Sequence, residues 1–141
     1  MSLLGRLFGK HAHKQTPVAE VRQLIDRFTT ATHAGVDAED IGRYPHKQRM
    51  VMAFHFGAIE YLAQQHQLDE TETLGVFVMF LDKYFNLPVT ETGSISELLG
   101  GFESSADMQK YREAGLDVFR RWHEQNERRA PLQLGEMLQN V

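Results

Sequence analysis

The chain has 141 residues, 42% of them hydrophobic and 24% charged, which is the size and composition of one globular domain. It has no cysteine, which excludes disulfides, cysteine-ligated metal centres and thiol chemistry. Three of its 15 Lys and Arg lie in the first 14 residues, which hold no acid, so the rest carries 12 basic and 19 acidic residues. This acidic body argues against a nucleic-acid-binding protein, because that class neutralises phosphates with cations.

A basic amphipathic segment, residues 1–15, precedes the first predicted body helix. If residues 3–10 are helical, four large apolar side chains occupy an arc of about 140° and the cations lie outside it. The segment lacks the pattern of a secretory signal, a membrane span or a myristoylation site. A frayed terminus, docking on protein and weak contact with a membrane surface all stay open, and we expect docking on protein. The four apolar residues are Leu3, Leu4, Leu7 and Phe8.

The first body helix is predicted to begin at Pro17, with Thr16 as its cap, because proline suits the first helical position. Gly35 is expected to end this helix. A turn-rich stretch follows, with one short helical turn expected after Asp37. One apolar stripe at helical spacing is formed by Val18, Val21, Leu24, Ile25 and Phe28.

Two long helices, 46–67 and 70–85, are predicted to form a central antiparallel hairpin, because the loop between them is very short. Asp69 and Glu72 resemble a capping box at the start of the second helix. Both helices are apolar on most sides, so either the other helices bury them or part of their surface is a dimer or partner interface. The interface candidates are Val76, Met79 and Phe80, which lie outside the main apolar face, together with Leu3, Leu4, Leu7 and Phe8.

A short helix is predicted after the loop 89–94. Ser94 and Glu97 match a capping box that would open it. The pair Gly100-Gly101 is expected to stop it, because glycine disfavours a helix interior.

The last long helix is predicted from Ser105 to about Arg129, and Pro131 is expected to end it. Its narrow apolar stripe contains Met108, Tyr111, Gly115, Val118, Phe119 and Trp122. Residues 131–141 read as a tail with one or two helical turns, on which Leu134, Met137 and Leu138 share a side.

These elements predict an all-α fold: a single-domain helical bundle of about four longer helices plus short ones, with the central antiparallel hairpin 46–67/70–85. The predicted organisation is an N-terminal arm at 1–15, a helical domain at 16–130 and a C-terminal tail at 131–141. No strand pattern and no internal repeat is visible.

No catalytic motif or metal-ligand spacing points to a catalytic or metal-binding residue, and we expect no cofactor. His55 is the one polar side chain inside the apolar arc of the helix 46–67. It is interpreted as a core histidine with hydrogen-bonded partners, or as the centre of a ligand pocket that also uses Glu60 or Asp82.

Four arginines gather near the end of the last long helix. They could form a patch for an acidic partner or a phosphate. They could equally be solvated cations that complement the helix dipole and are partly neutralised by Glu124 and Glu127. The four are Arg120, Arg121, Arg128 and Arg129.

The expected function is a non-catalytic helical protein-interaction module: an adaptor, regulator or accessory subunit that self-associates as a homo-oligomer. One alternative is a small ligand-binding protein or enzyme with a pocket around His55. Another is peripheral membrane association through residues 1–14. We expect a cytoplasmic location, with the membrane surface as a weak second site.

Overall fold

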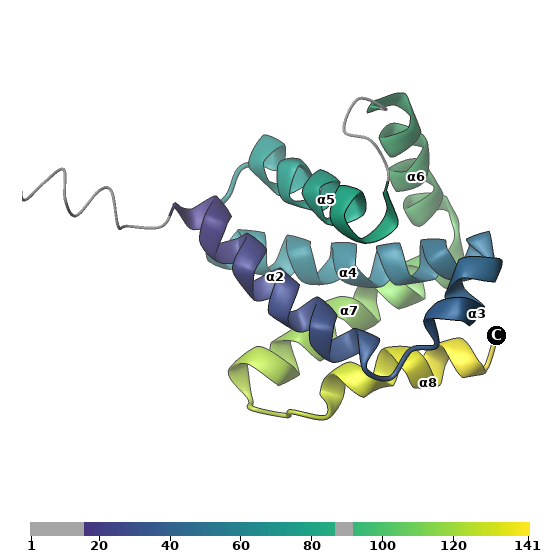
Figure 1. The fold of residues 1–141 in the computed structure, drawn as a ribbon. Coiled ribbons are helices and arrows are strands. Elements are labelled where there is room, and N and C mark those ends of the chain that lie inside the picture. Colours follow the sequence, from purple (N-terminus) through teal and green to yellow (C-terminus); the bar gives the residue numbers. More distant parts are fainter. Residues whose placement is uncertain (1–15, 87–91) are drawn as a thin grey trace, which may run out of the picture.

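The computed structural model describes residues 16–86 and 92–141, and within these ranges every regular element is helical. The long helix α4 lies at the centre and the other helices pack around it (Figure 1). The predicted all-α bundle is confirmed, and the predicted arm, with Leu3, Leu4, Leu7 and Phe8, lies outside the described residues. In chain order the elements are α2 Pro17–His33, α3 Ala38–Arg43, α4 Pro45–Gln65, α5 Glu70–Phe85, α6 Thr92–Ser104, α7 Ala106–Glu124, the 3₁₀ turn η1 Ala130–Leu132, and α8 Gln133–Gln139.

Several helices begin where side-chain caps predict, but α6 begins at Thr92, two residues before the predicted cap Ser94. The hydroxyl of Thr16 accepts a hydrogen bond from the amide of Ala19 at 3.1 Å. Asp69 accepts from the amide of Glu72 at 2.7 Å, and the Glu72 carboxylate accepts from the amide of Asp69 at 3.0 Å. This capping box satisfies two amides that the first turn of α5 would otherwise leave unpaired.

Two predicted helix ends are wrong. Helix α6 does not stop at Gly100-Gly101 but continues to Ser104. The continuation buries Phe102 completely. Burying a phenylalanine is worth about 1.5–3 kcal/mol, which offsets a cost of about 1 kcal/mol for each glycine.

Helix α7 ends at Glu124 rather than near Arg129. Asn126 adopts the left-handed conformation with a φ of 56°, which an L-residue in a continuing helix does not adopt. The carbonyl of Arg121 accepts hydrogen bonds from the amides of Gln125 and Glu127, both at 3.1 Å. These bonds close the helix, as C-terminal caps do, and turn the chain back toward η1 and α8.

The backbones of α4 and α7 touch where the two helices cross. A Cβ atom added at Gly57 would lie 1.9 Å from the carbonyl oxygen of Arg112. A Cβ added at Gly115 would lie 1.7 Å from the carbonyl oxygen of Phe54. Both distances are far inside van der Waals contact, so only glycine permits this approach. The close crossing helps to bury every residue of α4 from 51 to 59.

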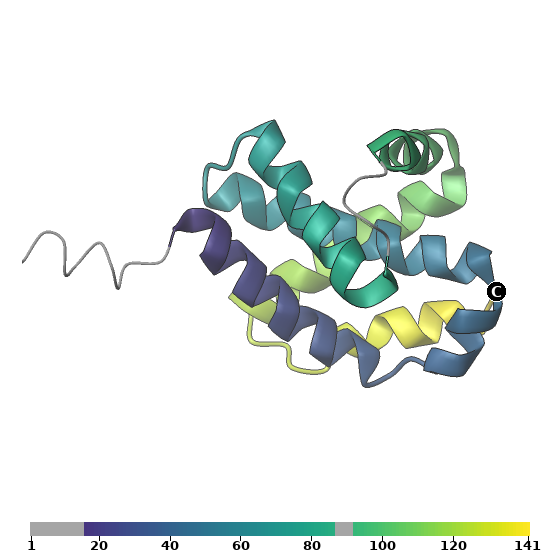
Figure 2. The ribbon, with the colours of Figure 1, turned by 45° about the horizontal axis from the view of Figure 1, so that its top comes forward.

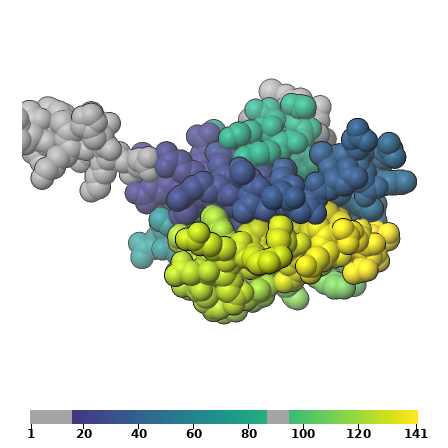
Figure 3. Space-filling model, turned by 60° about the horizontal axis from the view of Figure 1, so that its bottom comes forward, coloured from purple at the N-terminus to yellow at the C-terminus, as the bar shows by residue number. Residues whose placement is uncertain are grey.

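The C-terminal residues pack against the body. Leu134 and Leu138 of α8 are buried and Met137 is half-buried, so the residues predicted to share a side of the tail face the core. A Cβ added at Gly135 would lie 2.0 Å from the carbonyl oxygen of Gly35, so α8 rests directly on the turn after α2. Figure 3 shows the surface of α8 (yellow) continuing into that of α2 and α3 (dark blue).

One expectation about the hairpin is corrected. Val76 and Phe80 are buried in the core of the same chain, whereas Met79 is 39% exposed. Helix α5 packs on both α2 and α4, so it is covered from two sides. The ring of Phe80 stacks on that of His55 with centroids 4.8 Å apart. Val76 and Phe80 therefore present no surface to a partner, and Met79 alone of the three is exposed.

We predict that Gly57→Ala and Gly115→Ala each lower the free energy of unfolding by about 3 kcal/mol or more, because the added methyl meets a backbone carbonyl that cannot move aside. Urea denaturation followed by circular dichroism measures this change. The matched control is Gly75→Ala on α5, where an added Cβ meets nothing within 4 Å. Gly75→Ala should raise stability by up to about 1 kcal/mol, the helix propensity difference. Equal stability of Gly57→Ala and the natural protein would contradict the close crossing.

Candidate functional site

His55 is a core histidine with both ring nitrogens paired. Its Nδ1 lies 2.8 Å from the carbonyl oxygen of Val51 and donates to it. Its Nε2, which then carries no proton, accepts from the hydroxyl of Thr32 at 3.0 Å. Burial lowers the pKa of His55 to about 3, against the favourable hydrogen bond to Val51, so the ring is neutral at pH 7.

The three ligand-pocket candidates do not come together. Glu60 follows His55 by five residues, which places it about 140° away around α4. It faces α7, where it pairs with Arg112. Asp82 is exposed on α5. It lines a separate hollow of about 220 Å³ together with Arg22, Asp26 and Lys83.

A cavity of about 310 Å³ lies near His55 but is lined by its neighbour His33. The His33 ring stands edge-on to those of His55 and Tyr84, with centroids 5.9 and 5.7 Å away. These neighbours exclude water from the ring and lower the pKa of His33. Sequence reasoning did not single out His33, because it lies off the apolar stripe of α2. The other lining residues include Val36, Ile41, Gln48, Val51 and Phe85.

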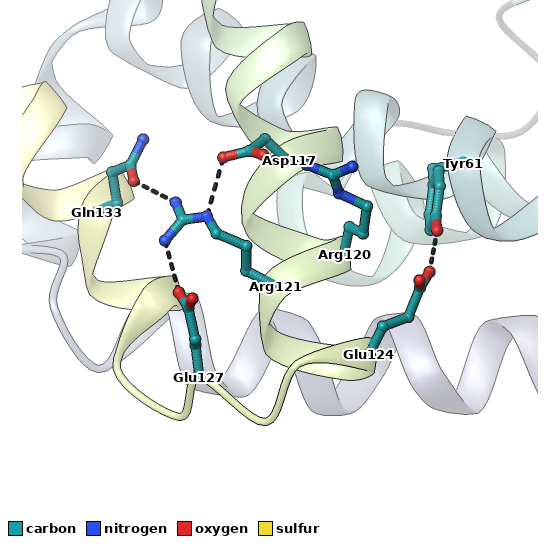
Figure 4. A network of polar contacts seen from close by, with 7 residues as sticks. All are labelled: Tyr61, Asp117, Arg120, Arg121, Glu124, Glu127 and Gln133. Carbon is teal, nitrogen blue, oxygen red and sulfur yellow. Dashed lines mark hydrogen bonds and ion pairs between the residues drawn. The ribbon is translucent and has the colours of Figure 1, made fainter.

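Of the four clustered arginines, Arg121 is engaged in three contacts within the chain (Figure 4). Its guanidinium donates to Asp117 at 2.9 Å, to Glu127 at 2.9 Å and to Gln133 at 2.6 Å. Arg120 donates to the other oxygen of Asp117 at 2.9 Å. The hydrogen bond to Glu127 raises the pKa of Arg121. The same bond joins α7 to the following turn.

The remaining two arginines, Arg128 and Arg129, are exposed beside Glu136. Glu124 does not neutralise an arginine as expected but accepts a hydrogen bond from the hydroxyl of Tyr61 (Figure 4). The four cations therefore do not form one continuous basic surface. Two of the four are neutralised locally. Of the acids that neutralise them, only Glu127 was expected from the sequence.

The candidate site is a groove of about 570 Å³ between α4, α5, α6 and α7, and it combines apolar and charged side chains. Helices α5 and α6 both lie over α4 and diverge from one another (Figure 2). We call it the leucine groove and define it by its lining residues, which are Phe56, Glu60, Tyr61, Gln64, Leu68, Glu70, Thr73, Leu74, Leu99, Glu103, Arg112 and Leu116.

An ion pair without net charge lies in the wall of the groove and joins α4 to α7. The Nε and Nη2 atoms of Arg112 donate to the two carboxylate oxygens of Glu60, both at 2.7 Å. The guanidinium also lies 5.1 Å from the ring centroid of Phe56. The bond to Glu60 raises the pKa of Arg112, so this two-pronged pair stays ionised and holds α7 against α4.

The groove combines apolar walls with an acidic rim. Leu116 of α7 is 38% exposed, and Leu68, Leu74 and Leu99 are half-buried. Glu70 and Glu103 are exposed at its edges. With Glu60 and Arg112, the lining holds three acids and one base, a net charge of −2.

Sequence reasoning found one residue of this groove, Glu60, and for another reason. Leu116 follows Gly115 but lies outside the apolar stripe of α7, and it is exposed. A leucine outside the stripe was therefore the one sign in the sequence that could have pointed to this surface. The groove itself is made by residues from separate helices, and their spacing along the chain shows no pattern. Only the packing of the four helices brings these leucines to one surface.

We predict that His55 makes stability fall with acid. Unfolded, the ring takes up a proton near its ordinary pKa of 6.5, whereas folded it resists protonation down to about 3. The contribution of His55 to stability is therefore fully present above about pH 6.5 and falls by about 1.4 kcal/mol per pH unit between there and about pH 3. His55→Phe should lose about 2 kcal/mol less than the natural protein between about pH 7 and pH 5 in urea unfolding. His46→Gln, which removes a histidine from the surface, is the control. An unchanged slope in His55→Phe would contradict the assignment.

Comparisons of this chain with protein-family models, with curated proteins and with solved structures find no match. Among residues 16–86 and 92–141, no three His, Asp or Glu side chains gather in a way that could hold a metal ion. Nor is any helix in these ranges both long and apolar enough to cross a bilayer. The chemistry of the site is thus defined by its own residues: apolar walls, an acidic rim and a neutralised ion pair.

Proposed function

We propose that this chain is a non-catalytic protein-interaction module whose recognition surface is the leucine groove. Its partner is an amphipathic segment of a protein, with large apolar side chains on one face and Lys or Arg on the other. The observation that carries the proposal is the groove itself, in which exposed or half-buried leucines from four parts of the fold lie between two exposed glutamates.

The apolar walls favour insertion of apolar side chains. Leu116 and its half-buried neighbours lose their remaining contact with water when a partner covers them. Each Å² of apolar surface removed from water contributes about 25 cal/mol, and grooves of this kind accept amphipathic helices.

The acidic rim selects the charge of the partner. Glu70 and Glu103 are exposed, so they can pair with incoming cations without first losing all their water. Because Arg112 is already paired with Glu60, it does not repel those cations as a free charge would. Such rim charges contribute mainly to specificity and to the rate of association.

The positions of the candidate acid–base groups favour binding over catalysis. His55 is neutral with both nitrogens paired, Glu60 is held by Arg112, and Asp82 lies on another surface. A general base must lie within hydrogen-bond reach of its substrate, which a fully covered ring does not offer. With Val76 and Phe80 buried, the hairpin face gives no support to self-association, so the proposed partner is a separate segment.

We predict that the full chain binds a labelled amphipathic peptide of leucine and lysine more tightly than its leucine–glutamate counterpart, by about tenfold or more, in fluorescence anisotropy. Leu116→Asp should weaken binding of the leucine–lysine peptide by about tenfold. Met79→Asp is the matched control, because Met79 is 39% exposed against 38% for Leu116 but lies outside the groove. Equal affinities for both peptides, or equal effects of the two substitutions, would overturn the proposal.

A second prediction concerns the rim. Glu103→Lys should weaken binding of the leucine–lysine peptide and flatten its dependence on salt, because one attractive charge becomes repulsive. Glu97→Lys makes the same change of charge on an exposed part of α6 that does not line the groove. Titrations at low and high salt compare the two variants. The rim plays no part if both behave alike.

A further inference from the structure

We propose that the leucine groove is occupied by the N-terminal segment of the same chain, residues 1–14, and that an outside partner must displace this segment. The inference rests on the proposed function of the groove. It commits to one occupant, and the arguments for it are the chemistry of the segment, the place where α2 begins and the length of chain available.

The segment has the chemistry that the groove favours. Its large apolar residues are Leu3, Leu4, Leu7 and Phe8, which fall on one side of a helix. Its charged residues are the cations Arg6, Lys10 and Lys14, with no acid among residues 1–14. A groove with leucine walls and a net charge of −2 complements both features.

The start of α2 lies next to one end of the groove. The carboxylate of Glu20, in the first turn of α2, lies 3.5 Å from Nδ1 of His66 at the end of α4. Two and four residues after His66, Leu68 and Glu70 line the groove. The start of α2 at Pro17 therefore lies beside the turn between α4 and α5 (Figure 1).

The length of the segment suits this path. Fifteen residues span up to about 50 Å when extended, and a helix over residues 3–10 is only about 12 Å long. A short tether also gives a local concentration in the millimolar range. Contacts that would be too weak to hold a free peptide at cellular concentration can therefore hold this one for much of the time.

A second copy of the chain and a membrane are both less favoured than the chain's own segment as binding partners here. A second copy would offer an identical segment, but at its bulk concentration rather than at the higher concentration set by a tether. An anionic membrane would attract the three cations but repel the body, which carries a net charge of −7 without residues 1–14. Within one molecule, by contrast, the acids of the groove attract the cations of the segment.

Paramagnetic relaxation in the full chain tests the inference directly. Because the chain has no cysteine, Ser2→Cys creates a single site for a nitroxide label. We expect the strongest broadening at the methyl groups of Leu74, Leu99 and Leu116, and loss of this pattern when Leu7→Asp and Phe8→Asp are added. Strongest broadening elsewhere, or a pattern that the two substitutions leave unchanged, would overturn the inference.

A mixed sample identifies the donor of the segment. Labelled chain without isotopes is added to isotope-labelled chain without nitroxide, so that broadening arises only between molecules. The inference expects no broadening of the groove methyls in this sample. Broadening equal to that in the single-molecule experiment means that a second copy supplies the segment, which overturns occupancy by the same chain.

Competition separates failure of this inference from failure of the proposed function. If the segment fills the groove, the Leu7→Asp, Phe8→Asp variant should bind the leucine–lysine peptide about threefold or more tightly than the natural chain. Unchanged, measurable affinity overturns occupancy by the segment and leaves the binding function intact. Failure of both chains to bind the peptide overturns the proposed function as well.

Discussion

The contact on which the structure depends is the crossing of α4 and α7, where Gly57 and Gly115 let two backbones touch. Hydrophobic burial drives helices together, but side chains normally hold their axes 8–10 Å apart. Here the missing side chains remove that spacing at one point. The crossing helps to close off the middle of α4, and Arg112 and Glu60, each three residues from a crossing glycine, meet in a two-pronged ion pair.

With α7 held against one side of α4, the other helices cover what remains. Helices α2 and α5 enclose the face that carries His55, whose ring stacks on Phe80 and bonds to Thr32. Helices α5 and α6 lie over α4 but diverge, and the space between them becomes the leucine groove. The same arrangement therefore buries the residue that looked most like a functional group and opens a surface made of ordinary leucines.

The packing of the helices also decides which charged side chains are paired within the chain and which stay exposed. Two of the four cations that the sequence gathers into a patch are paired within the chain: Arg120 binds Asp117, and Arg121 binds Asp117, Glu127 and Gln133. Exposed acids remain at the groove, where nothing in the described structure neutralises Glu70 or Glu103 with an ion pair. A surface that is apolar and negative favours a partner that is apolar and positive. That chemistry is also present in the first 14 residues of the chain.

The sequence by itself determined the helical class and the places where most helices begin, because caps such as Thr16 and Asp69 and the spacing of apolar residues act within one turn. It did not determine where α6 and α7 end, since the end of α6 depends on the burial of Phe102. Nor did it determine which apolar residues would be covered: Val76 and Phe80 are buried because two helices reach α5, while Leu116 of α7 stays exposed in the groove. The groove exists only in the tertiary structure, since its walls come from four helices whose relative placement no local pattern encodes.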